Sequence, residues 1–133
     1  MSSVYTLIPR PIGEFAGLDM TARYAFGLIY DRWQLSRKKD NRDRYKDKHG
    51  IYCVFSREAM AAEMGISLPT LRTALRRLNE RGLLRAELPI SGGAWRYYLT
   101  YKAVKDLESR RDLDGDLFDP DVSLYRDCFE NAP

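Results

Sequence analysis

The middle of the chain, residues 55–99, carries the pattern that most restricts its fold. Two segments with apolar residues at helical spacing, Phe55–Met64 and Leu68–Arg81, are separated by the turn Gly65-Ile66. Two strand-like segments follow, Leu83–Leu88 and Ala94–Leu99, and the residues between them favour a turn. Helix, turn, helix and hairpin in this order predict a winged helix-turn-helix. The fold class expected is α+β, mainly helical, with a small antiparallel sheet and a C-terminal extension.

The ends of the two helices are marked by residues that commonly cap helices. Ser56 and Ser67 stand where N-caps are expected, because a serine hydroxyl accepts from the free amides of the first turn. Gly65 and Gly82 stand just past the two C-termini, and Pro69 lies in a first turn where no amide donor is needed. The side chains of the first helix expected to face inward are Met60, Ala61 and Met64.

The second helix has two faces of different chemistry. The face expected to be buried consists of Leu68, Leu71, Ala74, Leu75 and Leu78. The opposite face presents Pro69, Thr70, Thr73, Arg76 and Arg77, with Arg72 at the flank. Arginine can donate to both acceptors of a guanine edge, and threonine is short enough to let a helix approach the bases. The pattern favours a recognition helix in a DNA major groove, although a helix-turn-helix can also serve protein contact alone.

Other residues are candidates for contacts to the DNA backbone. Ser56 and Ser67 leave free amides at helix starts, where the helix dipole favours a phosphate, and Arg57, Arg85 and Arg96 are candidate clamps. The full set of candidate DNA-binding residues is Ser56, Arg57, Ser67, Pro69, Thr70, Arg72, Thr73, Arg76, Arg77, Arg85 and Arg96.

The net charge of +3 is divided unevenly along the chain. Residues 1–103 contain 18 Lys and Arg against 10 Asp and Glu, which gives +8, whereas residues 104–133 contain 4 against 9, which gives −5. A basic body is typical of a domain that binds a polyanion, but both parts are also compatible with ordinary solvated surface. We expect a winged-helix DNA-binding domain over residues 1–103 and an acidic C-terminal extension over 104–133, which could link to a second domain.

The N-terminal part contains an extended segment and a helix. Val4–Ile8 has β-type composition and stops at Pro9, so it is expected as a short strand or an arm, paired with this chain's sheet or with a second copy. Asp19 or Thr21 can cap the helix that follows. Its main apolar face consists of Ala22, Ala25, Phe26, Ile29 and Trp33, and Tyr24, Leu28 and Tyr30 lie outside that face. Either a partner covers these three, or the helix is fully buried in its own domain.

Residues 37–49 form a strongly charged segment. It contains seven Lys and Arg, three Asp and no aliphatic residue, which predicts a mobile loop outside the core. Such a loop could follow a phosphate backbone or simply be solvated. The next segment, Ile51–Phe55, is expected to be the first strand of the sheet.

Past Tyr101 we expect a short charged helix, Ala103–Arg111, and then apolar residues that pack onto the domain or a partner. These residues are Leu117, Phe118, Leu124, Tyr125 and Phe129. Asp112, Asp114 and Asp116 alternate like the start of a calcium loop. However, Leu117 stands at the position of the loop's glycine and Ser123 at that of its closing glutamate, so calcium is rejected.

Several classes of function are disfavoured by composition. Cys53 and Cys128 form no closely spaced pair, which is typical of ordinary thiols in a reducing cytosol. No apolar run reaches membrane-spanning length and no signal-peptide core occurs, so a cytoplasmic location is expected. With His49 as the sole histidine and no glycine-rich phosphate loop, we expect no enzymatic activity, no cofactor and no metal site.

Two blocks, ARYAFGLIYDRWQLS at Ala22–Ser36 and IYCVFSREAMAAEMGISLPTLRTALRRLNERGLL at Ile51–Leu84, resemble a known family. It is the family of plasmid replication initiators of the RepA N-terminal type, found in Gram-positive bacteria and their mobile elements. The resemblance implies a winged helix that binds repeated origin sequences, dimerises and cooperates with host replication proteins. By resemblance, Tyr5–Ile8 and the Ala22–Ser36 helix become candidate dimer contacts.

The chain departs from the family pattern at three places. The loop after Ser36 lacks the usual Asn-Gly-Trp turn, Leu68 replaces a common lysine, and the turn at 89–93 has no basic residue. Members also usually carry a further C-terminal domain. The expected function is sequence-specific binding of double-stranded DNA at replication-origin repeats, by a homodimer. The alternatives are a transcriptional regulator on a palindromic operator and a purely structural adaptor.

Overall fold

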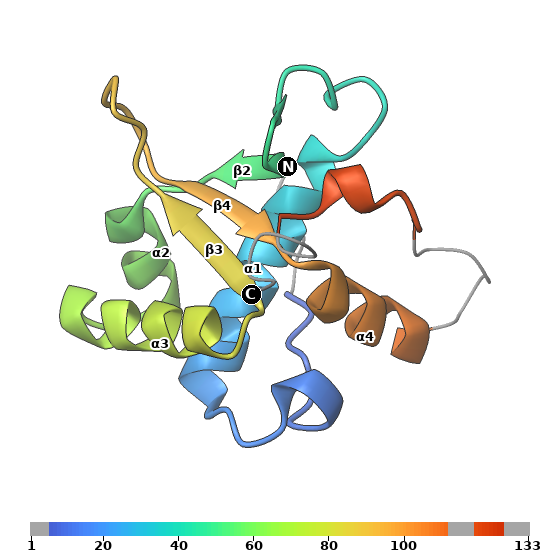
Figure 1. Cartoon of the computed structure of the whole chain (residues 1–133). Coiled ribbons are helices and arrows are strands. Elements are labelled where there is room, and N and C mark those ends of the chain that lie inside the picture. The colour runs from blue at the N-terminus through green and yellow to red at the C-terminus, as the bar shows by residue number, and fades with distance from the viewer. Residues whose placement is uncertain (1–5, 112–118, 127–133) are drawn as a thin grey trace.

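The computed structural model describes residues 6–111 and 119–126, which form a small sheet surrounded by helices (Figure 1). Along the chain the elements are η1 (Gly13–Phe15), α1 (Met20–Ser36), β1 (Lys46–Asp47), β2 (Gly50–Val54), α2 (Arg57–Met64), α3 (Leu68–Glu80), β3 (Leu84–Glu87), β4 (Arg96–Leu99), α4 (Tyr101–Arg111) and η2 (Val122–Leu124). The arrangement is the α+β winged helix-turn-helix that the sequence predicts. Within the described ranges, no helix is both long and apolar enough to span a membrane.

The helix-turn-helix forms through the caps that its sequence provides. The Ser56 hydroxyl accepts from the Ala59 amide at 2.9 Å, and the Ser67 hydroxyl accepts from the Thr70 amide at 3.3 Å. Gly65 ends α2 in the left-handed region at φ 70°, a conformation that glycine adopts without strain. The predicted boundaries are therefore confirmed to within one or two residues.

The predicted buried faces are also confirmed, with small differences. Leu71, Ala74, Leu75 and Leu78 of α3 are buried, whereas Leu68, in the first turn, is only half-buried. In α2, Met60 and Ala61 are buried and Met64 is half-buried.

The sheet has four antiparallel strands in the order β1-β2-β4-β3. β3 and β4 form the hairpin that we call the wing, with Leu84 opposite Leu99 and Glu87 opposite Arg96. β2 pairs with β4 and places Tyr52 opposite Tyr98. Both predicted strands of the wing and the predicted strand at Ile51–Phe55 are therefore present.

The charged segment at residues 37–49, which we call the basic loop, differs from the prediction at both ends. Lys46–Asp47 forms β1 at an edge of the sheet, where strand pairing needs only backbone groups and charged side chains can stay in water. At the other end, the Arg37 side chain is only 11% exposed and pairs with the buried Glu108. A segment expected wholly outside the core is thus anchored at its two ends.

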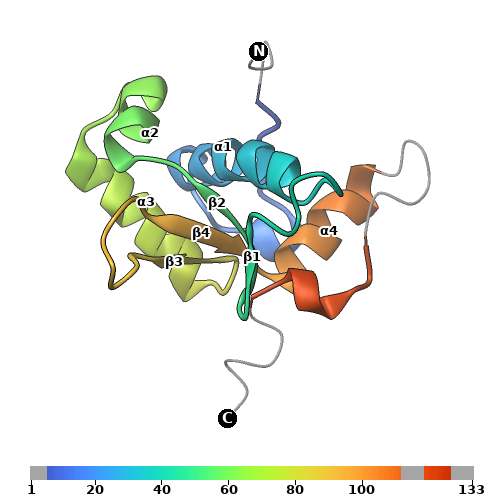
Figure 2. The ribbon, with the colours of Figure 1, turned by 90° about the horizontal axis from the view of Figure 1, so that it is seen from above.

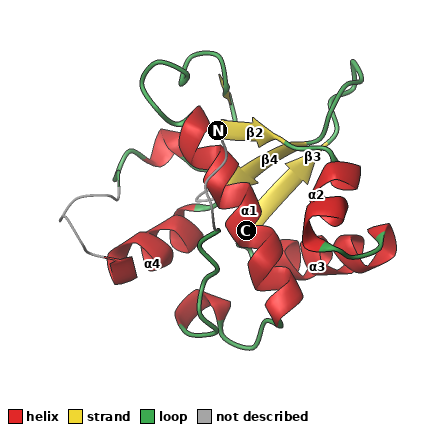
Figure 3. Ribbon diagram, turned by 180° about the vertical axis from the view of Figure 1, so that it is seen from behind, coloured by secondary structure: helices red, strands yellow, loops and turns green. Residues whose placement is uncertain are grey.

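Helix α1 crosses one face of the sheet and packs against α3 (Figures 2 and 3). Asp19 caps it, and its predicted apolar face is buried. Leu28 and Tyr30, outside that face, are buried as well, and the Tyr30 hydroxyl donates to Glu108 of α4 at 2.5 Å. Tyr24 is half-buried. The chain itself therefore covers most of α1, as in the second of the two alternatives.

The N-terminal residues that the structure describes lie against α1 without pairing to a strand. A Cβ atom added to Gly27 would be 2.3 Å from the Leu7 carbonyl oxygen, so the absence of a side chain at Gly27 permits this approach. The arm interpretation therefore holds for Thr6–Ile8, and their pairing with this chain's sheet was wrong, whereas pairing with the sheet of a second copy stays a prediction. Val4 and Tyr5 lie outside the described residues.

The first part of the acidic extension packs into the same core. The predicted helix is present as α4, and Val104 and Leu107 are buried. Leu124 and Tyr125 join the core as expected. The other positions discussed above lie outside the described residues: Asp112, Asp114, Asp116, Leu117, Phe118, Cys128 and Phe129. The division into residues 1–103 and 104–133 stays a prediction.

Candidate nucleic-acid interface

Helices α2 and α3 and the tip of the wing lie on the same side of the molecule, at the left in Figure 1. Helix α4 lies at the opposite end (Figures 1 and 2). The side chains of α3 that point away from the core on this side are Pro69, Thr70, Arg72, Thr73 and Arg76, which we call the exposed face of α3. The structure therefore brings five of the predicted contact residues together on one helix face.

The two threonines of the exposed face use their hydroxyls locally. Thr73 Oγ1 donates to the Pro69 carbonyl at 3.1 Å, and Thr70 Oγ1 lies 2.9 Å from the Ser67 hydroxyl. Because these hydroxyl groups already have partners, the threonines offer mainly methyl groups and small size to a ligand. They leave room for a nucleic-acid backbone or base edge to approach the helix.

The three arginines predicted on α3 differ in their contacts. Arg72 is exposed, and its side chain makes no ion pair or hydrogen bond among the residues that the structure describes. Arg76 lies 4.0 Å from Glu80, and both side chains are more than 60% exposed, a geometry that contributes little energy. Arg77 differs from both, because its Nη1 lies 2.6 Å from Asp19 at the start of α1. Arg77 thus connects two helices, and only Arg72 and Arg76 remain available on this face.

Further arginines fix the C-terminal end of α3. Arg81 donates to the carbonyls of Ala16 and Glu14, at 2.7 and 3.0 Å. Arg85 donates to the backbone and side-chain oxygens of Asn79, at 3.1 and 2.6 Å. Arg85, predicted as a clamp for DNA, is therefore bound to the end of α3.

The other predicted clamps, Arg57 and Arg96, have different environments. Arg96 pairs with Asp47 at 3.1 Å and lies over the Tyr52 ring, so its charge is already balanced. The Arg57 guanidinium lies 3.8 Å from the centre of the Trp95 ring, and its Nε donates to the Tyr97 hydroxyl at 3.3 Å. Arg57 has no carboxylate partner among the described residues. Burial raises the pKa of Tyr97 above its usual value, so this acceptor stays neutral. Only Arg57 of the two keeps an unpaired charge.

The remaining predicted positions are the two capping serines. Ser56 and Ser67 are exposed at the starts of α2 and α3. The wing contributes no cation at its tip, where Ile90 is fully exposed.

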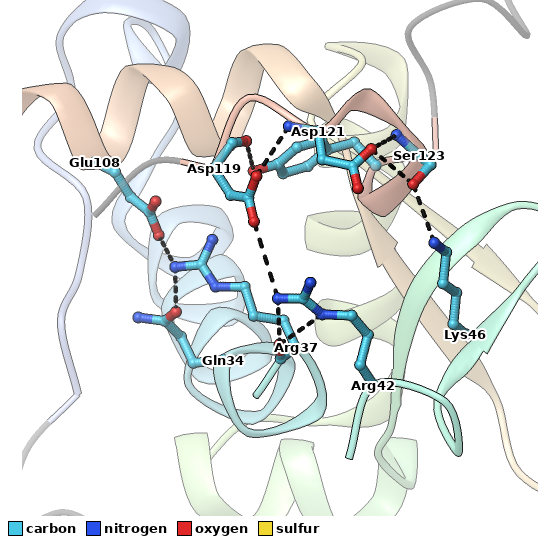
Figure 4. A network of polar contacts seen from close by, with 9 residues as sticks. Gln34, Arg37, Arg42, Lys46, Glu108, Asp119, Asp121 and Ser123 are labelled. Atoms are coloured by element: carbon cyan, nitrogen blue, oxygen red, sulfur yellow. Dashed lines mark hydrogen bonds and ion pairs between the residues drawn. The ribbon is translucent and has the colours of Figure 1, made fainter. Parts of the chain in front are cut away.

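The basic loop is bound by the C-terminal part of the chain (Figure 4). Arg37 donates to Gln34 and Glu108, and Arg42 lies 3.9 Å from Asp119. Lys46 donates to the Ser123 hydroxyl at 3.0 Å. Three cations of the loop therefore have partners within the chain, so the loop is a weaker candidate for DNA contact than its charge suggests.

One residue beside this site has no counterpart in the helix-turn-helix pattern. Arg32, an exposed residue of α1, holds its guanidinium 3.8 Å from the centre of the Phe55 ring, next to the Ser56 cap. Nothing in the sequence indicates this contact, because Arg32 lies in a helix that precedes the motif.

No family model and no curated protein sequence matches this chain. Several solved structures share its fold, among them the following three. One, described as the N-terminal domain of a DNA-binding protein, is 19% identical, with a TM-score of 0.53 over 81% of this chain and 86% of that one. The second, a Rep-DNA complex, is 20% identical, with a TM-score of 0.55 over 81% and 87%. The third, an MDR initiator, is 16% identical, with a TM-score of 0.52 over 80% and 88%. Likeness at such low identity establishes a common fold.

Proposed function

We propose that this chain binds double-stranded DNA in a sequence-specific manner and places α3 in the major groove. The observation that carries the proposal is the exposed face of α3, where Arg72 forms no ion pair with any described residue and Arg76 is only weakly paired. An arginine at such a position can donate to two acceptors of a guanine, and a helix fits the width of the major groove. The fold shared with one partner of a Rep-DNA complex supports the same assignment.

The biological role that we propose is initiation of plasmid or mobile-element replication at repeated origin sites. The resemblance of Ala22–Ser36 and Ile51–Leu84 to initiators of the RepA type supports this role, as does the fold shared with an MDR initiator. In this role the protein is a cytoplasmic homodimer that marks the origin for host replication proteins and performs no chemistry itself. Each copy would place one α3 in one half-site.

A selection of bound fragments from the DNA of the parent replicon tests the proposal. It is carried out at about physiological salt, where nonspecific phosphate binding is weak. A cluster of direct repeats is the expected result. A single palindrome beside a promoter would favour a transcriptional regulator instead, and folded protein that recovers no fragment above background would contradict DNA binding.

A further inference from the structure

Several arginines of the described residues are bound by oxygen atoms: Arg37, Arg77, Arg96 and Arg126 pair with carboxylates, and Arg81 and Arg85 donate to carbonyls. Three of these, Arg37, Arg96 and Arg126, lie over a ring as well, so each has both a ring and a carboxylate. Arg32 and Arg57 instead lie over aromatic rings, each 3.8 Å from a ring centre, without a carboxylate partner in the described part of the chain. These two guanidinium groups keep a full positive charge in a fixed position.

A ring and a carboxylate leave an arginine with different capacities for binding. A carboxylate occupies N–H donors and neutralises the charge. A ring face attracts the flat side of the guanidinium, so the donors at its edge stay available for an anion. Because the ring also restricts the side chain, less rotamer entropy is lost when the anion binds. A guanidinium held by a ring is therefore well prepared to bind a phosphate.

One ring lies just before the helix-turn-helix and the other lies in the wing. Phe55 is 3% exposed and directly precedes the cap of α2, so it gives Arg32 a rigid support. Trp95 lies beside β4 of the wing, and Arg57 is the first residue of α2. Arg32 belongs to α1, which precedes the helix-turn-helix of α2 and α3, and it places a further cation near the start of α2.

We propose that Arg32 contacts the DNA backbone and forms, together with Arg57, a phosphate clamp on either side of the start of α2. The inference rests on the proposed function and extends the interface from the helix-turn-helix to α1. A phosphate contact carries no base information, so the clamp adds affinity and orientation for every sequence alike.

The salt dependence of binding to random-sequence double-stranded DNA tests the clamp. The variants are Arg32→Gln and Arg57→Gln, and the control is Lys105→Gln, which removes another cation held by a ring, 5.8 Å from Tyr101 on α4. The slope of log K against log salt is negative, and each lost phosphate contact should make it shallower by about 0.9. Arg32→Gln and Arg57→Gln should each show this change, Lys105→Gln should keep the slope of the parent, and Arg32→Lys should restore most of it.

Three outcomes would count against these ideas in distinguishable ways. If Arg32→Gln binds with the slope of the parent, Arg32 is no contact and the clamp is wrong. If Lys105→Gln loses as much slope as Arg32→Gln, the effect reflects net charge alone and the clamp is again wrong. If the parent does not bind duplex DNA even at low salt, the proposed function itself fails. Circular dichroism of each variant shows that it is folded.

Discussion

Arg76 and Arg77 are neighbours in sequence, yet the structure gives them different tasks. Arg76 projects from the exposed face of α3 with one weak ion pair, whereas Arg77 reaches Asp19 at 2.6 Å. Asp19 also caps α1 by accepting from the Ala22 amide at 2.9 Å. One arginine is thus available to a ligand, and the other holds α3 against α1.

The variant Arg76→Ala should lose specific binding, with Arg77→Ala as its matched control. If Arg76 contacts a base, Arg76→Ala should cost about 1–3 kcal/mol on a selected duplex and little on random DNA. Arg77→Ala should lower the free energy of unfolding by about 1 kcal/mol or less, because its ion pair is half exposed. Titration of both duplexes and urea unfolding measure these effects. If both variants lose the preference for the selected duplex over random DNA to the same extent, Arg76 and Arg77 do not have separate roles.

Cys53 should be inert to thiol reagents in the folded protein. It is buried in β2, and burial raises the pKa of its thiol to about 12, so very little thiolate exists at about pH 8. In a Cys128→Ser background, the native protein should react far more slowly than the protein in denaturant. Equal rates would show that β2 opens readily.

At the scale of elements, the contact between α1 and the N-terminal arm depends on Gly27. A Cβ atom there would lie 2.3 Å from the Leu7 carbonyl oxygen, a distance that backbone atoms cannot tolerate without moving. Gly27→Ala should therefore lower the free energy of unfolding by about 1–3 kcal/mol, despite alanine's higher helix propensity.

The test is a double-mutant cycle between Gly27→Ala and deletion of residues 1–8. In the shortened chain the clash is absent, so the same substitution should be neutral or stabilising by up to about 1 kcal/mol. Urea unfolding of the four proteins measures the coupling. An equal cost in both backgrounds would show that the arm does not approach Gly27.

The elements of this fold could be predicted because their signals are local. Ser56, Ser67 and Gly65 act within a few residues of their own positions, so the helix boundaries follow from the sequence. The strand β1 was missed because it lacks the apolar alternation by which strands are recognised.

The candidate site could be predicted only in part, because long-range partners decide which cations are free. Arg77 finds Asp19 at a separation of 58 residues, and Arg37 finds Glu108 at 71. Neither ion pair can be inferred from the spacing of residue types in the local sequence. Spacing identified the exposed face of α3, but it could not show that Arg77, Arg85 and Arg96 are bound elsewhere or that Arg32 lies beside α2.

At the scale of the whole molecule, a buried ion pair joins α4 to the end of α1. The Glu108 side chain is fully buried and accepts from Tyr30 and Arg37. Removing one partner of a buried pair leaves an uncompensated charge, which typically costs about 3–5 kcal/mol. Helix α4 is therefore expected to unfold together with the rest of the domain.

Glu108→Gln tests this coupling. It should lower the free energy of unfolding by about 3 kcal/mol, whereas Arg37→Met combined with Glu108→Leu should cost far less, because no charge remains buried. Urea unfolding should be followed by far-ultraviolet circular dichroism and by tryptophan fluorescence, with coincident transitions for both probes. A separate early transition in the parent would show that α4 is an independent unit.

The apolar face of α3 is buried along most of its length, but its polar contacts to other elements are concentrated at one end. Arg77 and Arg81 attach its C-terminal half to residues 14–19, and Arg85 of β3 donates to Asn79 near its end, while in the described part of the chain its first turn has only its cap. The helix is therefore anchored like a beam at its C-terminal end, while its N-terminal end is the one that would contact DNA. In the proposed complex, a displacement of α3 by DNA at Thr70 or Arg72 would pass through Arg77 and Arg81 to the residues before α1. Insertion of α3 into the DNA major groove would therefore first shift the residues around η1, on the side of the molecule away from the wing.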